Sequence, residues 1–216
     1  MAEVMDVAAD LRRAAEFFAE ALRPSQNGSK WTNTARPTDW SCRDTLDHVA
    51  NALCGYAASL SLRLRTRRQH HPRNGDTSAS VPDLFDAIAA FAEMLAVIAE
   101  SAPTDVRAFH PAGMADRDGF IAMGCDEILV HGHDVASTLR IEYQPAADLA
   151  ARVLTRLFPW VEPNANPWDM LLWANGRVAL PGKARLGADW WWHCAPLDEW
   201  SGIEARRTES DRPGWK

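Results

Sequence analysis

Several features of well-known protein classes are missing from this sequence of 216 residues. The four cysteines, Cys42, Cys54, Cys125 and Cys194, show no CxxC spacing. This argues against a zinc ribbon or a redox pair and favours reduced thiols that fill a core. No apolar run approaches the roughly 20 residues of a membrane span, and charged residues interrupt the apolar positions of the N-terminal segment, unlike a signal peptide. We therefore expect a cytoplasmic protein with no membrane partner.

The sequence also lacks the charge and the motifs of several functional classes. Its formal net charge is -6 and its pI is near 5.6, so we expect no binding to nucleic acid, which needs clustered Lys and Arg. The one basic cluster, residues 63–73, is interpreted as a solvated helix end. The absence of GxSxG, P-loop and GxGxxG motifs removes the usual sequence arguments for a serine hydrolase, an NTPase or a nicotinamide enzyme.

Long amphipathic segments are what the first 142 residues do contain. Apolar residues at helical spacing predict four helices, over residues 3–22, 41–66, 83–101 and 117–140. The polar connection at residues 70–82, which includes His70 and His71, is too long for a tight hairpin. It permits a crossover that leaves the second and third helices running in the same direction. The predicted fold is mainly α, a four-helix bundle with a long crossover connection over residues 1–142.

The rest of the chain differs in character. For residues 143–204 we predict a small α/β appendage. It is expected to contain a short helix that ends at Pro159 and a further helical turn or two closed by Gly176. Two short strands are predicted at RVALPG (177–182) and DWWWHCAPL (189–197). We interpret the tryptophans gathered here as the seal of a small module, with a substrate-binding role as the alternative: Trp173, Trp190, Trp191, Trp192 and Trp200. Residues 205–216 are expected to form a disordered tail.

The stretch MGCDEILVHGHDVAS, residues 123–137, places an acid in the middle of a core-facing stripe. On a helical wheel the apolar residues group around Glu127, and His131 and Asp134 fall on the same side. An ionised carboxylate there costs several kcal/mol unless it meets a proton, a cation or a metal. A hydrogen bond between Glu127 and His131 is an alternative explanation, because residues four positions apart on a helix can reach each other. His133 points away from Glu127 and is expected to face solvent.

A further metal-ligand candidate comes from the second predicted helix. His48 lies opposite the main apolar face of that helix, among small residues that indicate the close approach of another helix. Two histidines and one carboxylate are a ligand set that holds a catalytic divalent metal and leaves one coordination position open. We therefore predict His48, Glu127 and His131 as metal ligands, with Asp134 and Asp44 as groups that orient the histidines or act as a base.

The loop before this helix carries two tryptophans. Trp31, Pro37 and Trp40 are expected to lay aromatic surface across the mouth of the bundle. An ordinary packed loop is the alternative.

Two motifs resemble a known family. RDTLDHV around His48 and DEILVHGHDVA around Glu127 and His131, joined by a long crossover linker, resemble the DinB-like superfamily, and within it the mycothiol-dependent maleylpyruvate isomerase-like proteins of actinobacteria. The resemblance covers the architecture of residues 1–142 and is specific at the two motifs. It implies a crossover four-helix bundle, with His48, Glu127 and His131 as ligands of a divalent metal at which relatives activate a low-molecular-weight thiol.

The resemblance sets the functional expectation. We expect a metal-dependent thiol transferase or isomerase that acts on a small electrophile, with Zn²⁺ as the metal, Ni²⁺ as an alternative in the purified protein, and mycothiol or another small thiol as cofactor. A zinc-bound thiol loses its proton near neutral pH and becomes a nucleophile. Isomerase-type relatives carry a larger C-terminal domain than the roughly 70 residues of this chain. Arg177, Arg185 and His193 are the candidates there for binding an anionic or sugar-bearing cofactor.

Two other functions stay open from the sequence. One is a noncatalytic stress or small-ligand-binding protein that contains a metal. The other is a hydrolase that activates metal-bound water. For each of these functions we expect a monomer or a homodimer.

Overall fold

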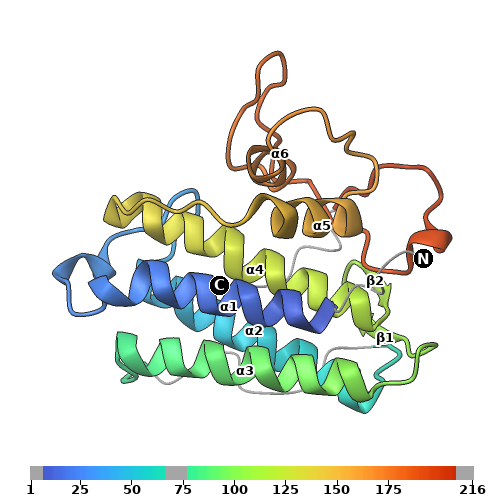
Figure 1. The fold of residues 1–216 in the computed structure, drawn as a ribbon, viewed down its shortest axis with the longest axis horizontal. Coiled ribbons are helices and arrows are strands. Elements are labelled where there is room, and N and C mark those ends of the chain that lie inside the picture. The colour runs from blue at the N-terminus through green and yellow to red at the C-terminus, as the bar shows by residue number, and fades with distance from the viewer. Residues whose placement is uncertain (1–6, 67–76, 208–216) are drawn as a thin grey trace.

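The computed structural model describes residues 7–66 and 77–207 and is mainly helical (Figure 1). The long helices are α1 (Val7–Leu22), α2 (Cys42–Leu62), α3 (Val81–Ser101) and α4 (Arg117–Leu139), and the shorter ones are α5 (Ala147–Leu157) and α6 (Pro167–Ala174). Three 3-10 helices are η1 (Arg23–Ser25), η2 (Ser29–Thr32) and η3 (Leu197–Glu199). The four helices predicted for the first part of the chain are therefore present. His70 and His71 lie outside the described residues.

Side-chain caps fix where α2, α3 and α4 begin. The Ser41 hydroxyl accepts a hydrogen bond of 3.0 Å from the backbone amide of Asp44 at the start of α2. Ser80 and Asp83 form a reciprocal capping box at α3, and Asp116 accepts from a backbone amide in the first turn of α4 at 2.8 Å. Because a capped start holds the first turn in place, the register of the two helices that carry the candidate ligands is fixed from their N-terminal ends.

Helices α2 and α3 run in the same direction, an arrangement that the length of the connection between them permits. Arg43, in the first turn of α2, donates to the carbonyl of Ala79, just before α3 begins. At the other end, the amide of Phe109 in the strand after α3 donates to the carbonyl of Leu64 just after α2. In Figure 1 these two helices lie alongside each other and their colours advance from the same end.

Helix α4 is covered on more than one side. It packs against α1, α2 and α3, and also against α5, which lies between α4 and α6 in Figure 1. Every residue from 119 to 130 is buried. A Cβ on Gly124 would meet side chains of three helices at 3.1–3.2 Å, those of Leu11, Leu53 and Leu95. Polar side chains on opposite sides of α4 are therefore buried. The sequence pattern, by contrast, predicts that only one side of this helix faces the core.

The prediction of two strands in the C-terminal part is wrong. Between residues 143 and 207 the structure contains no strand, only an isolated bridge between Leu180 and Lys183 and another between Trp190 and Arg206. Gly182 has a φ of +73° and reverses the first segment at once, as glycine does in tight turns. In the second segment Trp191 and the next residue are both buried, which breaks the alternation of faces that a half-buried strand requires.

The sheet of the described residues lies instead between α3 and α4. β1 (Ala108–His110) pairs antiparallel with β2 (Gly113–Ala115), with Phe109 opposite Met114. Gly113 has a φ of +139°, in the region that favours glycine. Strands of three residues are too short to show a period of two in the sequence, which explains the omission.

Arg206 and Arg207 lie within the predicted tail, and both contact the rest of the protein. Arg206 pairs with Asp189 at 2.9 Å, and the guanidinium of Arg207 lies 3.9 Å from the ring centre of Trp191. Residues 208–216 lie outside the described residues. Among the described helices, none has the length and apolar character that a membrane crossing requires.

Gly119, in the first turn of α4, lies against the backbone of the C-terminal part. A Cβ at this position would overlap the carbonyl oxygen of Cys194. We expect Gly119→Ala to lower the free energy of unfolding by about 1–3 kcal/mol in urea titrations, because a backbone carbonyl cannot move aside as a side chain can. Ser137→Ala, at an exposed position of the same helix, is the control and should stay within about 0.5 kcal/mol of the native chain. Equal stability of Gly119→Ala and the native chain would contradict the close contact.

Candidate metal centre

The three predicted ligands come together between α2 and α4. Nε2 of His48 and Nε2 of His131 each lie 3.2 Å from Oε2 of Glu127. One ligand atom from each of the three residues lies within 4.8 Å of the other two. A tetrahedral zinc ion with bonds of about 2.0–2.1 Å keeps its ligands roughly 3.3 Å apart. The two spacings between histidine and Glu127 are therefore close to those around a small divalent cation.

Helix geometry brings these side chains to one place. Glu127 and His131 are one turn apart on α4, so they share a face, and His48 is in the second turn of α2. The hydroxyl of Thr138, near the end of α4, donates to the carbonyl of Thr34, which precedes α2. The two helices therefore run in opposite directions. The start of α2 consequently faces the second half of α4.

The carboxylate of Glu127 is buried and has partners on both oxygens. Tyr56 donates its hydroxyl to Oε1 at 2.8 Å, while the two histidines approach Oε2. Burial alone raises the pKa of this carboxyl, but the adjacent His48 and His131 outweigh it and hold the pKa well below the usual range. Glu127 is thus ionised at neutral pH, as a metal ligand must be.

Tyr56 was not predicted as part of the site. It lies two helical turns after His48 and is one of only two tyrosines in the chain. A tyrosine on the same helix as His48 was the only sign of its role in the sequence. This sign was not sufficient, because its partner Glu127 is on another helix.

His131 is held from its other nitrogen. Nδ1 lies 3.1 Å from Oδ2 of Asp134, whose side chain is fully buried. Burial lowers the pKa of His131, but the hydrogen bond to Asp134 and the charge of Glu127 raise it to about 9. Nδ1–H therefore donates to Asp134 and Nε2 points at Glu127, which is the orientation that a ligand histidine needs. Of the two predicted orienting groups, Asp134 does contact a ligand. Asp44 is 56% exposed and pairs with Arg43 at 3.2 Å.

Trp40 covers the histidine pair. Its ring centre lies 4.5 Å from that of His48 and 6.0 Å from that of His131. Trp31, by contrast, is buried against Phe85, at 5.8 Å between ring centres. Of the two tryptophans expected at the mouth of the bundle, Trp40 lies at the candidate site and Trp31 belongs to a packed loop.

The other candidate residues lie as follows. Arg177 pairs with Asp134, Arg185 donates to the carbonyl of Gly176, and the ring of His193 lies 3.0 Å from the carbonyl of Pro196. Their predicted role toward an anionic or sugar-bearing cofactor stays a prediction.

His133, which was predicted to face solvent, is only partly exposed. Its ring centre lies 5.9 Å from that of Trp168, and burial lowers its pKa. The segment that contains α6 covers this side of α4, which the periodicity of α4 alone does not reveal.

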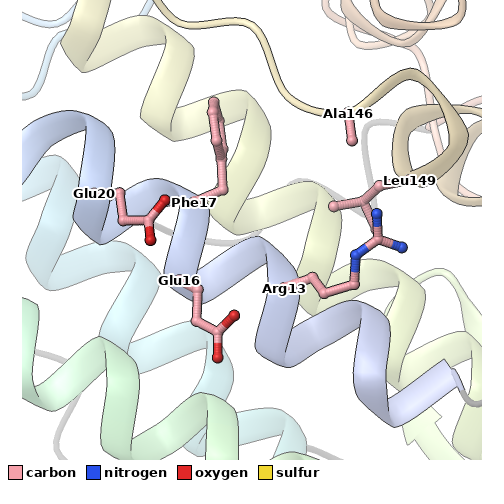
Figure 2. A pocket seen from close by; sticks show the side chains of 6 residues that line it. All are labelled: Arg13, Glu16, Phe17, Glu20, Ala146 and Leu149. Carbon is pink, nitrogen blue, oxygen red and sulfur yellow. The ribbon is translucent and has the colours of Figure 1, made fainter.

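A pocket of about 200 Å³ lies between α1 and the start of α5 (Figure 2). Its lining is formed by Arg13, Glu16, Phe17, Glu20, Ala146 and Leu149. Arg13 is already paired with Asp148, at 3.1 Å. None of the candidate ligands lines this pocket, so the candidate metal centre remains assigned to α2 and α4.

Comparisons with known proteins do not identify the chain. No family model, curated protein or solved structure matches it. The resemblance to mycothiol-dependent maleylpyruvate isomerase-like proteins therefore stays a prediction, and the function is inferred from the geometry of the three ligands.

Proposed function

We propose that this protein is a metal-dependent enzyme in which His48, Glu127 and His131 hold a divalent cation, and that it activates a low-molecular-weight thiol for transfer to a small electrophile or for its isomerisation. The main support is the convergence of two imidazole nitrogens on one buried carboxylate oxygen, each at 3.2 Å. The proposal includes the finer expectations from the sequence: the crossover four-helix bundle of the mycothiol-dependent maleylpyruvate isomerase-like family, zinc as the metal, a small-molecule substrate and a cytoplasmic location.

The charges of the site suit a further ligand with one negative charge, such as a thiolate. With Glu127 ionised and both histidines neutral, the three ligands carry one negative charge, and the neighbouring Asp134 and Arg177 cancel each other. Bound zinc lowers the pKa of a coordinated thiol, so that it becomes a thiolate near neutral pH. A single monoanion thus makes the buried site neutral. Trp40 adds an apolar surface beside the histidines that limits the access of water.

Zinc-dependent thiol turnover tests the proposal. Purified protein is loaded with zinc and assayed for the consumption of mycothiol, or of a surrogate thiol, with a chromogenic aryl halide. We expect turnover above background that requires zinc and falls to background in His48→Ala, because two ligands cannot hold the metal in place.

The outcomes of this assay are distinct. A chain that stays metal-free in excess zinc would sink the proposal. Zinc that raises thermal stability without turnover would favour the noncatalytic alternative, and turnover of an ester without thiol would favour the hydrolase.

The pH dependence of metal binding follows from His131. Its pKa near 9 in the metal-free protein means that zinc must displace the Nε2 proton at neutral pH. Zinc affinity should therefore rise with pH, by about tenfold per unit for this one proton, and level off above pH 9. Calorimetric titration at pH 7 in two buffers of different ionisation enthalpy measures the protons released. Binding without proton release would contradict this expectation.

A further inference from the structure

The C-terminal end of α6 directs two side chains toward α4. Gly176, with a φ of +66°, ends the helix in a Schellman arrangement, in which the amide of Arg177 donates to the carbonyl of Leu172 and that of Gly176 to the carbonyl of Trp173. Asn175 just before this turn donates its side-chain amide to Asp126 of α4 at 2.9 Å. The turn thus places the next residue, Arg177, beside the second half of α4.

Arg177 binds the carboxylate of Asp134, which accepts a hydrogen bond from the candidate ligand His131. Its Nε donates to Oδ1 of Asp134 at 3.2 Å and its Nη2 to Oδ2 at 2.8 Å, which is a two-point contact. A third donor, Nη1, reaches the carbonyl of Asn175 at 2.9 Å. Arg177 is only 9% exposed and the Asp134 side chain is 0% exposed, so the pair is shielded from water.

The contact continues to the metal centre. Oδ2 of Asp134, which Arg177 binds, also accepts from Nδ1 of His131, and Nε2 of the same ring points at Glu127. A carboxylate free to rotate would leave the imidazole free to turn and to exchange its proton between the two nitrogens. Fixing the carboxylate at two points removes both freedoms.

We propose that Arg177 is a positioning residue of the metal centre, which fixes the ring and the tautomer of His131 through Asp134. The C-terminal part thereby completes a site whose ligands all come from α2 and α4. This inference rests on the metal site proposed above. It gives Arg177 a role that does not depend on the anionic cofactor expected from the sequence.

Zinc affinity of Arg177→Met in the full chain is the test. Competition with a chromophoric chelator should show affinity about 10–100-fold below that of the native chain, the usual effect of removing a group that orients a metal ligand. Arg177→Lys keeps the charge but loses the two-point contact, so its affinity should fall by about three- to tenfold. In zinc-loaded protein, the Nδ1 proton of His131 should exchange with water slowly in the native chain and faster in Arg177→Met, because the carboxylate that accepts this proton is then no longer held at two points.

Arg152→Met is the matched control. Arg152 makes a two-point pair with Asp10, at 2.6 and 2.7 Å, and touches no candidate ligand. Its zinc affinity should equal that of the native chain. Native affinity in an Arg177→Met protein that is folded by circular dichroism would overturn the inference. If that variant does not fold, native affinity in Arg177→Lys would overturn it. Failure of the proposed function looks different, because the native chain itself would then bind no zinc or turn over no thiol.

Discussion

The Glu127→Gln variant is expected to lose at least about 100-fold of the zinc affinity of the native chain, more than the loss of an orienting group causes. Glu127 is the one anion among the three candidate ligands. Its replacement by an amide of the same size leaves an oxygen for the hydroxyl of Tyr56 but removes the charge that balances the cation. The two histidines would then have to hold zinc without a charged partner.

Chelator competition measures this loss, and thermal unfolding gives a second reading. Zinc at 1,000 times its dissociation constant stabilises the native chain by about 4 kcal/mol, and after a roughly 100-fold loss of affinity the same zinc concentration should stabilise Glu127→Gln by at most about 1.4 kcal/mol. Glu16→Gln is the charge-matched control, because Glu16 is an exposed residue of α1 at the pocket shown in Figure 2. Comparable zinc binding by Glu127→Gln and Glu16→Gln would mean that Glu127 is not a ligand.

Local patterns were sufficient to find the long helices and the three candidate ligands. Helical periodicity predicts an element from its own residues, and Glu127 with His131 is visible because both lie on one helix, one turn apart. His48 was found by its place among small residues on α2. In each case the informative residues are near one another in the sequence.

The partners of the ligands could not be found in this way. Tyr56 reaches Glu127 from another helix, and Arg177 reaches Asp134 across 43 positions of the chain. Nothing in the local sequence near Arg177 distinguishes an arginine that binds a buried carboxylate from one that binds a cofactor. The choice depends on how α6 is placed against α4, which is a tertiary property.

Asp126 illustrates the same limit. It precedes Glu127 but faces the C-terminal part, where Asn175 and Trp192 donate to its two oxygens at 2.9 and 3.1 Å. Burial raises its pKa to about 7, against the opposing effect of these donors. A single core-facing stripe on α4 gives no prediction for this residue. In the structure these two adjacent acids connect α4 to different neighbours. Glu127 contacts α2, and Asp126 contacts the segment after α5.

Loss of Asp134 should have the largest effect on stability. We expect Asp134→Ala to lower the free energy of unfolding at pH 7 by about 3–5 kcal/mol, because it leaves Arg177 and a protonated His131 buried without their common anion. Urea titration of metal-free protein measures the loss. Asp148→Ala is the control, since Asp148 is 54% exposed and pairs with Arg13 and Arg152 at the surface, and it should cost about 1 kcal/mol or less.

The pH dependence separates this charge effect from lost packing. Burial raises the pKa of Asp134, but His131 and Arg177 outweigh it and lower the pKa below its ordinary value. A carboxyl with a depressed pKa stabilises the fold above its unfolded pKa of about 3.9 and loses this contribution as pH falls through the folded value. The difference between the native chain and Asp134→Ala should therefore shrink below about pH 4, and it should also decrease as pH rises from about 6.5 toward 9, where His131 loses the proton that Asp134 stabilises. A difference that persists unchanged into acid would assign the loss to packing, and Asp134 would then not be the anion that joins the C-terminal part to the metal centre.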